Sequence, residues 1–311
     1  MDSVLFIPSI WENDWVRKIL PGKSAAELPI AGMRYIDYAI EEAIRLGAGL
    51  CEVFDWTYSQ SLADYFSDPT RTSHPVFYEK GQGPHPMGLD SLTDFKTPLT
   101  GTIEDGLIVV WGLCVTSHEP QETRLVPATE EECRNTPPGA YVRRNGRWMK
   151  SHPPGICISD ADTWHRVNFA ILRNPGSFTL PGYSAENGVY LGHNVVLEHG
   201  TEVKPPVLLE DNIWCARNVT LAGDVIVESG AFIGEGAYLK RTLVCADTYI
   251  GTGLDLTDKI VVGRRIIDPA SGAWTDIEEK GVARGIGESR VVKLLRGIWR
   301  FLKGKSHGRR G

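Results

Sequence analysis

The chain has 311 residues, of which 42% are hydrophobic and 23% charged, a composition ordinary for a soluble globular protein of two domains. It contains no run of about 18 apolar residues and no basic start followed by a long apolar core, which excludes a membrane-spanning helix and predicts no signal peptide. We therefore expect a cytoplasmic protein. Its six cysteines form no Cys-x-x-Cys pair and are expected to be reduced thiols.

The first elements predict the opening of a parallel α/β sheet. Residues 4–7 form a short apolar stretch, residues 34–46 have apolar side chains at helical spacing, and residues 50–56 form a second strand. A strand, a helix and a further strand in this order are typical of a parallel sheet. A third apolar run covers 107–115, and Asn145-Gly146 predicts a tight hairpin.

A six-residue repeat dominates the C-terminal part. Every sixth residue is apolar in the series Leu191, Leu197, Val203, Leu209, Cys215, Leu221, Val227, Ile233, Leu239 and Cys245. The residues two before each of these are apolar or small, and those three after are mostly turn formers. After Cys245 the frame slips by one residue and continues at Ile250, Leu256 and Val262.

This repeat predicts a parallel β-helix over about 189–267. In a short strand alternate side chains lie on one face, so residues two apart point inward together before a turn residue bends the chain. Three such hexads form a triangular coil of 18 residues, and stacked coils bury a column of aliphatic side chains. On this pattern Asn194 and Asn212, which are 18 apart, should stack on successive coils.

The end of the chain is basic. Residues 289–311 contain eight Lys or Arg residues and no acid, although the whole chain has a net charge of −6. Apolar residues at helical spacing between 291 and 302 predict a basic amphipathic helix, typical of an anchor on an anionic membrane surface. The alternative is a helix docked on the acidic body of the protein. We expect no nucleic-acid partner, because that body would repel phosphate.

The hexapeptide pattern resembles that of the trimeric acyltransferases and of many sugar nucleotidyltransferases. The resemblance implies a left-handed β-helix and a homo-oligomer such as a trimer. Within it, Leu191-Gly192-His193-Asn194-Val195 resembles the context of the catalytic His of hexapeptide acyltransferases. There the His is a general base, and an acyl-CoA or acyl carrier supplies the acyl group. The alternative is that His193 is a solvent-facing residue beside a turn.

The N-terminal part resembles the sugar-phosphate nucleotidyltransferases. The resemblance rests on Leu28-Pro29-Ile30-Ala31-Gly32 with the helix that follows, on residues 109–113, and on residues 162–168. It implies a Rossmann-like α/β domain that binds a sugar nucleotide or sugar phosphate. The residues that it implies for substrate binding are Ser9, Lys23, Pro29, Gly32, Gly112 and Asn194.

Three departures from this family weaken the implied chemistry. The stretch 8–15 has no glycine to approach nucleotide phosphates, the family's Lys falls on Ala25, and its metal-binding Asp falls on Leu113. Lys23 lies two residues from the family position and could substitute for the Lys. We therefore expect no metal site and a degenerate domain without nucleotidyl transfer.

Together these observations predict three segments: an α/β nucleotidyltransferase-like domain (1–180), a left-handed parallel β-helix (181–270), and a tail with a basic amphipathic helix (271–311). The predicted function is that of a sugar-nucleotide binder or regulatory partner subunit in polysaccharide or cell-envelope sugar metabolism. Two alternatives stay open, namely an acyltransferase that uses His193 and a trimeric scaffold peripheral to the membrane. We expect no cofactor to be needed for folding.

Overall fold

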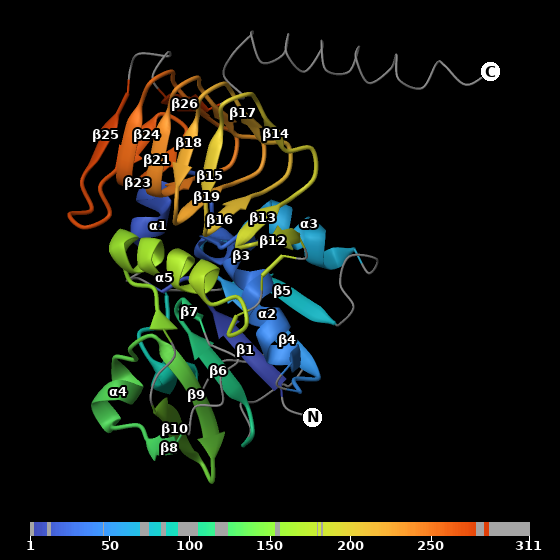
Figure 1. Ribbon diagram of the computed structural model, residues 1–311. Helices are drawn as coiled ribbons and strands as arrows, with labels where there is room; N and C mark the ends of the chain where they lie inside the picture. Colours follow the sequence, from blue (N-terminus) through green and yellow to red (C-terminus); the bar gives the residue numbers. More distant parts are fainter. Residues whose placement is uncertain are drawn as a thin grey trace. The chain divides into compact units, whose positions relative to one another are not determined.

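The computed structural model describes residues 3–10, 14–45, 47–68, 75–81, 85–92, 105–115, 124–152, 156–178, 180–181, 183–277 and 283–285. The chain divides into two compact units, residues 1–181 and 182–311 (Figure 1). No helix in these described ranges is long and apolar enough to cross a bilayer. The basic tail over 289–311, with its predicted amphipathic helix, lies outside the described residues.

The first unit mixes helices and strands. Its helices are α1 (Asp14–Ile19), α2 (Tyr35–Arg45), α3 (Gln60–Ser67), α4 (Glu130–Arg134) and α5 (Ala161–Arg173), with short 3-10 helices η2 (Ala25–Glu27) and η3 (Leu89–Leu92). Its strands are β1 (Ser3–Ile7), β2 (Pro29–Ile30), β3 (Met33–Arg34), β4 (Leu50–Asp55), β5 (Val76–Lys80), β6 (Ile108–Trp111), β7 (Cys114–Val115), β8 (Arg124–Pro127), β9 (Gly139–Arg144), β10 (Arg147–His152) and β11 (Ile156–Cys157).

Seven of these strands form one sheet, in the order β5-β4-β1-β6-β9-β10-β8. The strands β5, β4, β1 and β6 run parallel, with Phe6 of β1 between Val53 of β4 and Val110 of β6. The remaining three are added antiparallel. The expected parallel α/β opening is therefore confirmed, and β1 lies at its centre because four of its five residues are buried.

Two local predictions in this unit are also confirmed. The predicted helix 34–46 corresponds to α2, whose residues Ile36, Ala39, Ile40 and Ala43 form the buried stripe expected from their spacing. Asn145 and Gly146 join β9 to β10 with φ of 50° and 73°. Two successive residues with positive φ are the signature of a type I′ turn, which matches the twist of the paired strands.

The second unit is rich in strands. They are β12 (Ser184–Glu186), β13 (Val189–Leu191), β14 (Val196–Leu197), β15 (Glu202–Lys204), β16 (Val207–Leu209), β17 (Trp214–Cys215), β18 (Thr220–Ala222), β19 (Val225–Val227), β20 (Phe232–Ile233), β21 (Tyr238–Val244), β22 (Thr248–Ile250), β23 (Asp255–Val262), β24 (Arg265–Ile267), β25 (Trp274–Asp276) and β26 (Ala283–Gly285).

Most of these strands belong to parallel ladders with a constant offset. Val189 pairs with Val207 and Val207 with Val225, so successive partners are 18 residues apart. The ladders β14-β17-β20 and β15-β18-β21 have the same offset. The hexad positions Leu209, Cys215, Leu221, Val227, Ile233 and Leu239 are all fully buried and pack in one core cluster. The six-residue spacing therefore identifies the core of this unit.

The predicted place of the frame slip was wrong. Val227 pairs with Val244 and Ile233 with Ile250, an offset of 17, so the slip lies before Cys245. The turn after Leu239 is one residue shorter than the others. As a result Val244 and Val261 join the core cluster in place of the predicted Cys245 and Val262.

Leu197 also departs from the predicted inward column, because 40% of its surface is exposed. It belongs to β14, which is the first strand of its ladder and pairs with β17. A residue of an end strand has a neighbour on one side only, so the hexad pattern does not ensure its burial.

Candidate functional site

A cluster of polar side chains lies where the central strands of the first unit end. Ser9 comes two residues after β1, and Asp55 is the last residue of β4. Both follow apolar strand residues, and both are buried, with 1% and 0% of their surfaces exposed. Because β1 and β4 are parallel neighbours, the ends of both strands bring these residues to the same edge of the sheet.

Asp55 is the centre of this cluster. Its Oδ1 accepts hydrogen bonds from the Thr57 amide (2.9 Å), from the Thr57 hydroxyl (2.6 Å) and from the Ser9 hydroxyl. Its Oδ2 accepts the phenol of Tyr78 on β5 at 2.8 Å. Burial and then the negative charge of Asp55 raise the pKa of Tyr78 well above its ordinary value. Tyr78 is therefore a neutral donor, and Asp55 fixes the three elements around it.

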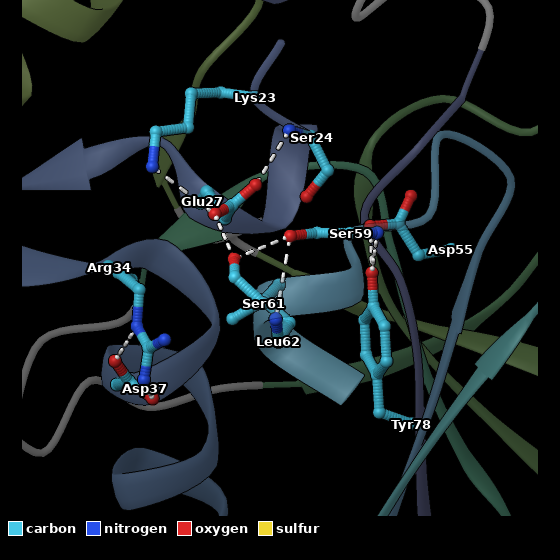
Figure 2. A network of polar contacts seen from close by, with 10 residues as sticks. All are labelled: Lys23, Ser24, Glu27, Arg34, Asp37, Asp55, Ser59, Ser61, Leu62 and Tyr78. Carbon is cyan, nitrogen blue, oxygen red and sulfur yellow. Dashed lines mark hydrogen bonds and ion pairs between the residues drawn. The ribbon is translucent and has the colours of Figure 1, made fainter. Parts of the chain in front are cut away.

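The network continues from Tyr78 to a second buried carboxylate (Figure 2). The amide of Ser59, the N-cap of α3, donates to the Tyr78 hydroxyl at 2.8 Å, and the Ser59 and Ser61 hydroxyls lie 2.8 Å apart. Ser61 donates to Oε1 of Glu27 at 3.0 Å. A chain of hydrogen bonds thus joins β4, α3 and η2 beside the sheet edge.

Glu27 is 6% exposed and lies in η2. Burial opposes its ionisation, but the Ser24 amide, the charge of Lys23 and the hydroxyls of Ser59 and Ser61 together lower its pKa. The Ser24 amide donates at 3.0 Å, and Nζ of Lys23 lies 3.4 Å from Oε1 of Glu27. Glu27 is thus held as an anion by donors on two sides.

The structure joins two of the substrate-binding residues expected from sequence to this network. Ser9 binds Asp55 directly, and Lys23 pairs with Glu27 while 56% of its side chain stays exposed. The ammonium of Lys23 could therefore reach an anionic ligand from the edge of the network. Figure 2 shows Lys23 and Glu27 on one side and Asp55 with Tyr78 on the other.

Gly112 lies at the end of the neighbouring strand β6. Its amide donates to the carbonyl of Ile7 at 2.9 Å, and its carbonyl accepts the Tyr35 hydroxyl at 3.1 Å. Its φ is 74°, and a Cβ there would lie 3.0 Å from Cδ1 of Ile10. A glycine is needed for both reasons, and it lets the segment after β6 approach the segment after β1 closely.

Pro29 and Gly32 lie on the hairpin β2–β3, which α5 holds in place. The indole of Trp164 donates to the Pro29 carbonyl at 2.6 Å, and Asn168 accepts the Ala31 amide at 2.7 Å. Two of the sequence segments that resemble the nucleotidyltransferases are therefore in direct contact. No contact in the described residues joins Pro29 or Gly32 to Asp55 or Glu27 themselves.

His193 and Asn194 belong to the second unit. The side chain of His193 is 86% exposed, and its Nδ1 lies 3.2 Å from the Asp211 carboxylate. Nδ2 of Asn194 donates to Oδ1 of Asn212 at 3.0 Å, which confirms the predicted stacking of these two residues. Both asparagines have positive φ, 57° and 60°, as turn residues of this ladder require.

Sequence reasoning missed Asp55, Tyr78 and Glu27. A single acid at the end of an apolar strand was a usable signal for Asp55, since a buried carboxylate needs donors. Tyr78 had none, because it lies in the stretch 57–105 that no pattern ordered. Glu27 follows Lys23 by four residues, a spacing that in a sequence predicts only an ordinary surface ion pair.

Among the described residues, no three His, Cys, Asp or Glu side chains are grouped as metal ligands. The groups that meet at the sheet edge are hydroxyls, two carboxylates and one ammonium from Lys23. Hydroxyls both donate and accept hydrogen bonds, as recognition of a polyhydroxylated ligand requires. The arrangement is therefore suited to binding by hydrogen bonds.

The first unit thus belongs to the class of α/β proteins that place polar groups at the carboxyl edge of a parallel sheet. No family model matches the chain. A UTP–glucose-1-phosphate uridylyltransferase of Synechocystis sp. (strain ATCC 27184 / PCC 6803 / Kazusa) is 26% identical over 118 residues, which are 38% of this chain and 30% of that protein. This distant match supports a nucleotidyltransferase-like relationship over part of the chain.

Proposed function

We propose that the first unit binds a sugar nucleotide or sugar phosphate at the sheet edge without transferring nucleotidyl groups. The chain would then serve as a binder or regulatory partner subunit in polysaccharide or cell-envelope sugar metabolism. One observation carries this proposal. The two positions where the resembling family has its Lys and its metal-binding Asp are Ala25 and Leu113, which are 2% and 0% exposed.

The burial of these two residues has a chemical consequence. Phosphoryl transfer depends on cations that offset the charge developing on the phosphate oxygens. Apolar side chains inside the core offer neither a cation nor a metal ligand. Lys23 remains, but its ammonium is shared with Glu27. This leaves enough positive charge to attract a phosphate, and the hydroxyls nearby can bind a sugar.

Calorimetry on the full chain tests binding, with UTP, glucose 1-phosphate and a uridine diphosphate sugar as ligands in the presence of Mg²⁺. We expect at least one of them to bind, and Lys23→Ala to weaken that binding about tenfold, the effect of roughly 1.4 kcal/mol. Lys150→Ala is the matched control, because Lys150 pairs with Glu132 on the antiparallel side of the sheet. Loss of binding in both variants, or no binding by the wild type, would refute the proposed site.

Pyrophosphate release tests the second half of the proposal. With a sugar 1-phosphate, a nucleoside triphosphate and Mg²⁺, we expect no release above background. Release that rises in proportion to the purified protein would show that the unit is an active nucleotidyltransferase.

For the second unit we propose a left-handed parallel β-helix that associates as a homo-oligomer such as a trimer. The constant offset of 18 residues and the buried hexad column support this coil. Sedimentation equilibrium of the full chain measures the association state, and a monomer at micromolar concentration would contradict the oligomer. A crystal structure would give the hand of the coil.

One observation favours a second candidate function, acyl transfer to a sugar hydroxyl or amine from an acyl-CoA or acyl carrier. His193 is exposed, and its Nδ1 lies beside the Asp211 carboxylate, which leaves Nε2 to act as a general base. Incubation with acetyl-CoA and sugar nucleotides would release CoA if this function is present. Loss of release in His193→Ala but not in His199→Ala would support it, and equal rates would contradict it.

A further inference from the structure

Two cysteines that are far apart in the sequence face each other in the first unit. The short strands β7 and β11 pair antiparallel, with Cys114 opposite Cys157. Their Sγ atoms lie 3.3 Å apart. The sequence had suggested only dispersed reduced thiols, since no Cys-x-x-Cys pair is present. The fold therefore creates a dithiol that the sequence spacing did not indicate.

The backbone around this pair suits a disulfide. The Ile158 amide donates to the Leu113 carbonyl at 2.8 Å, whereas the Cys114 amide donates to the Tyr35 hydroxyl at 3.1 Å. Cys114 and Cys157 are thus a non-hydrogen-bonded antiparallel pair. Such pairs bring opposing Cα atoms to about 4.5 Å, which lies within the span that disulfides bridge. Rotation of the two side chains is enough to form the bond.

The two thiols are chemically unequal. Cys114 is buried, whereas Cys157 is partly exposed. The hydrogen bond between them lowers the pKa of Cys157, where it outweighs burial, and raises the pKa of Cys114 together with burial. As a thiol, Cys157 also donates to the Pro138 carbonyl at 3.2 Å. Cys157 is therefore the thiol that an external reagent reaches and that ionises first.

We propose that Cys114 and Cys157 form a reversible intrachain disulfide by exchange with a low-molecular-weight disulfide such as oxidised glutathione. The Cys157 thiolate attacks one sulfur of the reagent, breaks its S–S bond and releases one thiolate, giving a mixed disulfide. The Cys114 thiol then loses its proton and attacks Sγ of Cys157, which releases the second thiolate. Two protein thiols are oxidised, one disulfide is reduced, and the released thiolates take up the two protons.

The position of this pair gives the reaction a structural effect. Cys114 follows Gly112 and Leu113, and its amide shares the Tyr35 hydroxyl with the Gly112 carbonyl. Cys157 precedes α5, whose Trp164 and Asn168 hold the β2–β3 hairpin. A disulfide would tie these two segments together and close the chain over 115–156. It should raise the melting temperature, because it restricts the unfolded chain.

Thiol mapping on the full chain tests the proposal. The reduced protein is equilibrated at increasing ratios of oxidised to reduced glutathione, alkylated, digested without reduction and analysed by mass spectrometry. We expect linked Cys114–Cys157 peptides in the wild type and in Cys133→Ser, which is the control because Cys133 is also partly exposed. In Cys114→Ser, Cys157 should carry glutathione. In Cys157→Ser, Cys114 should stay reduced.

Two results would overturn the proposal. One is a wild type in which other cysteines are glutathionylated while Cys114 and Cys157 stay unlinked. The other is glutathione on Cys114 ahead of Cys157. Melting curves supply a second readout, since oxidation should raise the melting temperature of the wild type and of Cys133→Ser but of neither of the other variants. An unchanged wild-type curve despite full linkage would contradict the structural effect.

Discussion

Replacing Leu221 by alanine tests whether the hexad pattern identifies the inward face of the second unit. Leu221 is fully buried in β18, and its register partners on the neighbouring strands are Val203 and Leu239. Its chain neighbour Thr220 lies on the opposite face of the same strand and is partly exposed. The two positions therefore differ in facing while sharing backbone and location, which makes Thr220→Ala the matched control.

The expected magnitude follows from the packing. Leu→Ala substitutions in cores cost about 2–5 kcal/mol, and the cost is greatest where neighbours cannot move into the cavity. Here the strands on both sides are fixed by parallel ladders, so we expect a loss of about 3–4 kcal/mol in the free energy of unfolding for Leu221→Ala. For a unit of this size that loss lowers the melting temperature by roughly 10 °C. Thr220→Ala should stay within about 0.5 kcal/mol of the wild type.

Thermal unfolding followed by circular dichroism measures the two effects. Because the chain has two units, hydrogen exchange of amides in β17, β18 and β20 shows which unit loses stability. A drop of equal size in both variants, or a larger drop for Thr220→Ala, would show that the assignment of faces is wrong. Destabilisation confined to the first unit would show that the column around Leu221 does not carry the stability of its own unit.

Three further predictions concern the sheet-edge network and the tail. The lowered pKa of Glu27 gives a stability contribution that is complete above about pH 4.3 and is lost as the pH falls through the folded-state value, so the deficit of Glu27→Gln in urea unfolding should shrink toward pH 3; a deficit independent of pH would contradict this. Asp55→Asn should cost about 2–3 kcal/mol in the same assay, because a donor replaces a buried acceptor, and Ser9→Ala about 1 kcal/mol; equal costs would refute Asp55 as the centre. Residues 289–311 should make the full chain sediment with anionic vesicles, less so in high salt, whereas a 1–288 truncation should not; equal sedimentation of both would exclude the tail as the anchor.

The second unit was largely predictable because its core residues recur at a fixed spacing. Inward positions such as Leu209 and Ile233 could be read by counting six, and the ladders confirm them. The frame slip was misplaced because Cys245 is apolar and continued the count. The backbone shows the shorter turn instead through the positive φ of Arg241, 43°, which no residue preference indicates. Arg241 pairs there with Asp258 in the turn of the next coil.

The sheet-edge network was predictable only in part. Ser9 and Lys23 came from a resemblance in the sequence, and both are joined to the network. Their partners Asp55 and Glu27 lie 46 and 4 residues away along the chain. The first separation is set by the crossover from β1 through α2 to β4, whose pairing brings the strand ends together. A contact of that kind has no periodicity, so a single sequence carries no signal for it.

The burial of both carboxylates decides how this edge can act on a ligand. Asp55 is fully buried and its oxygens accept bonds from Ser9, Thr57 and Tyr78, so its effect on a ligand is to position those donors. The network therefore holds Ser9 as a fixed hydroxyl, while Lys23 alone among the polar residues joined to Glu27 keeps more than half of its side chain exposed. A ligand with both a hydroxylated ring and a phosphate matches these two features. A nucleophile or a metal-bound phosphate would need a group that Ala25 and Leu113 do not supply, and for this reason the site favours binding over transfer.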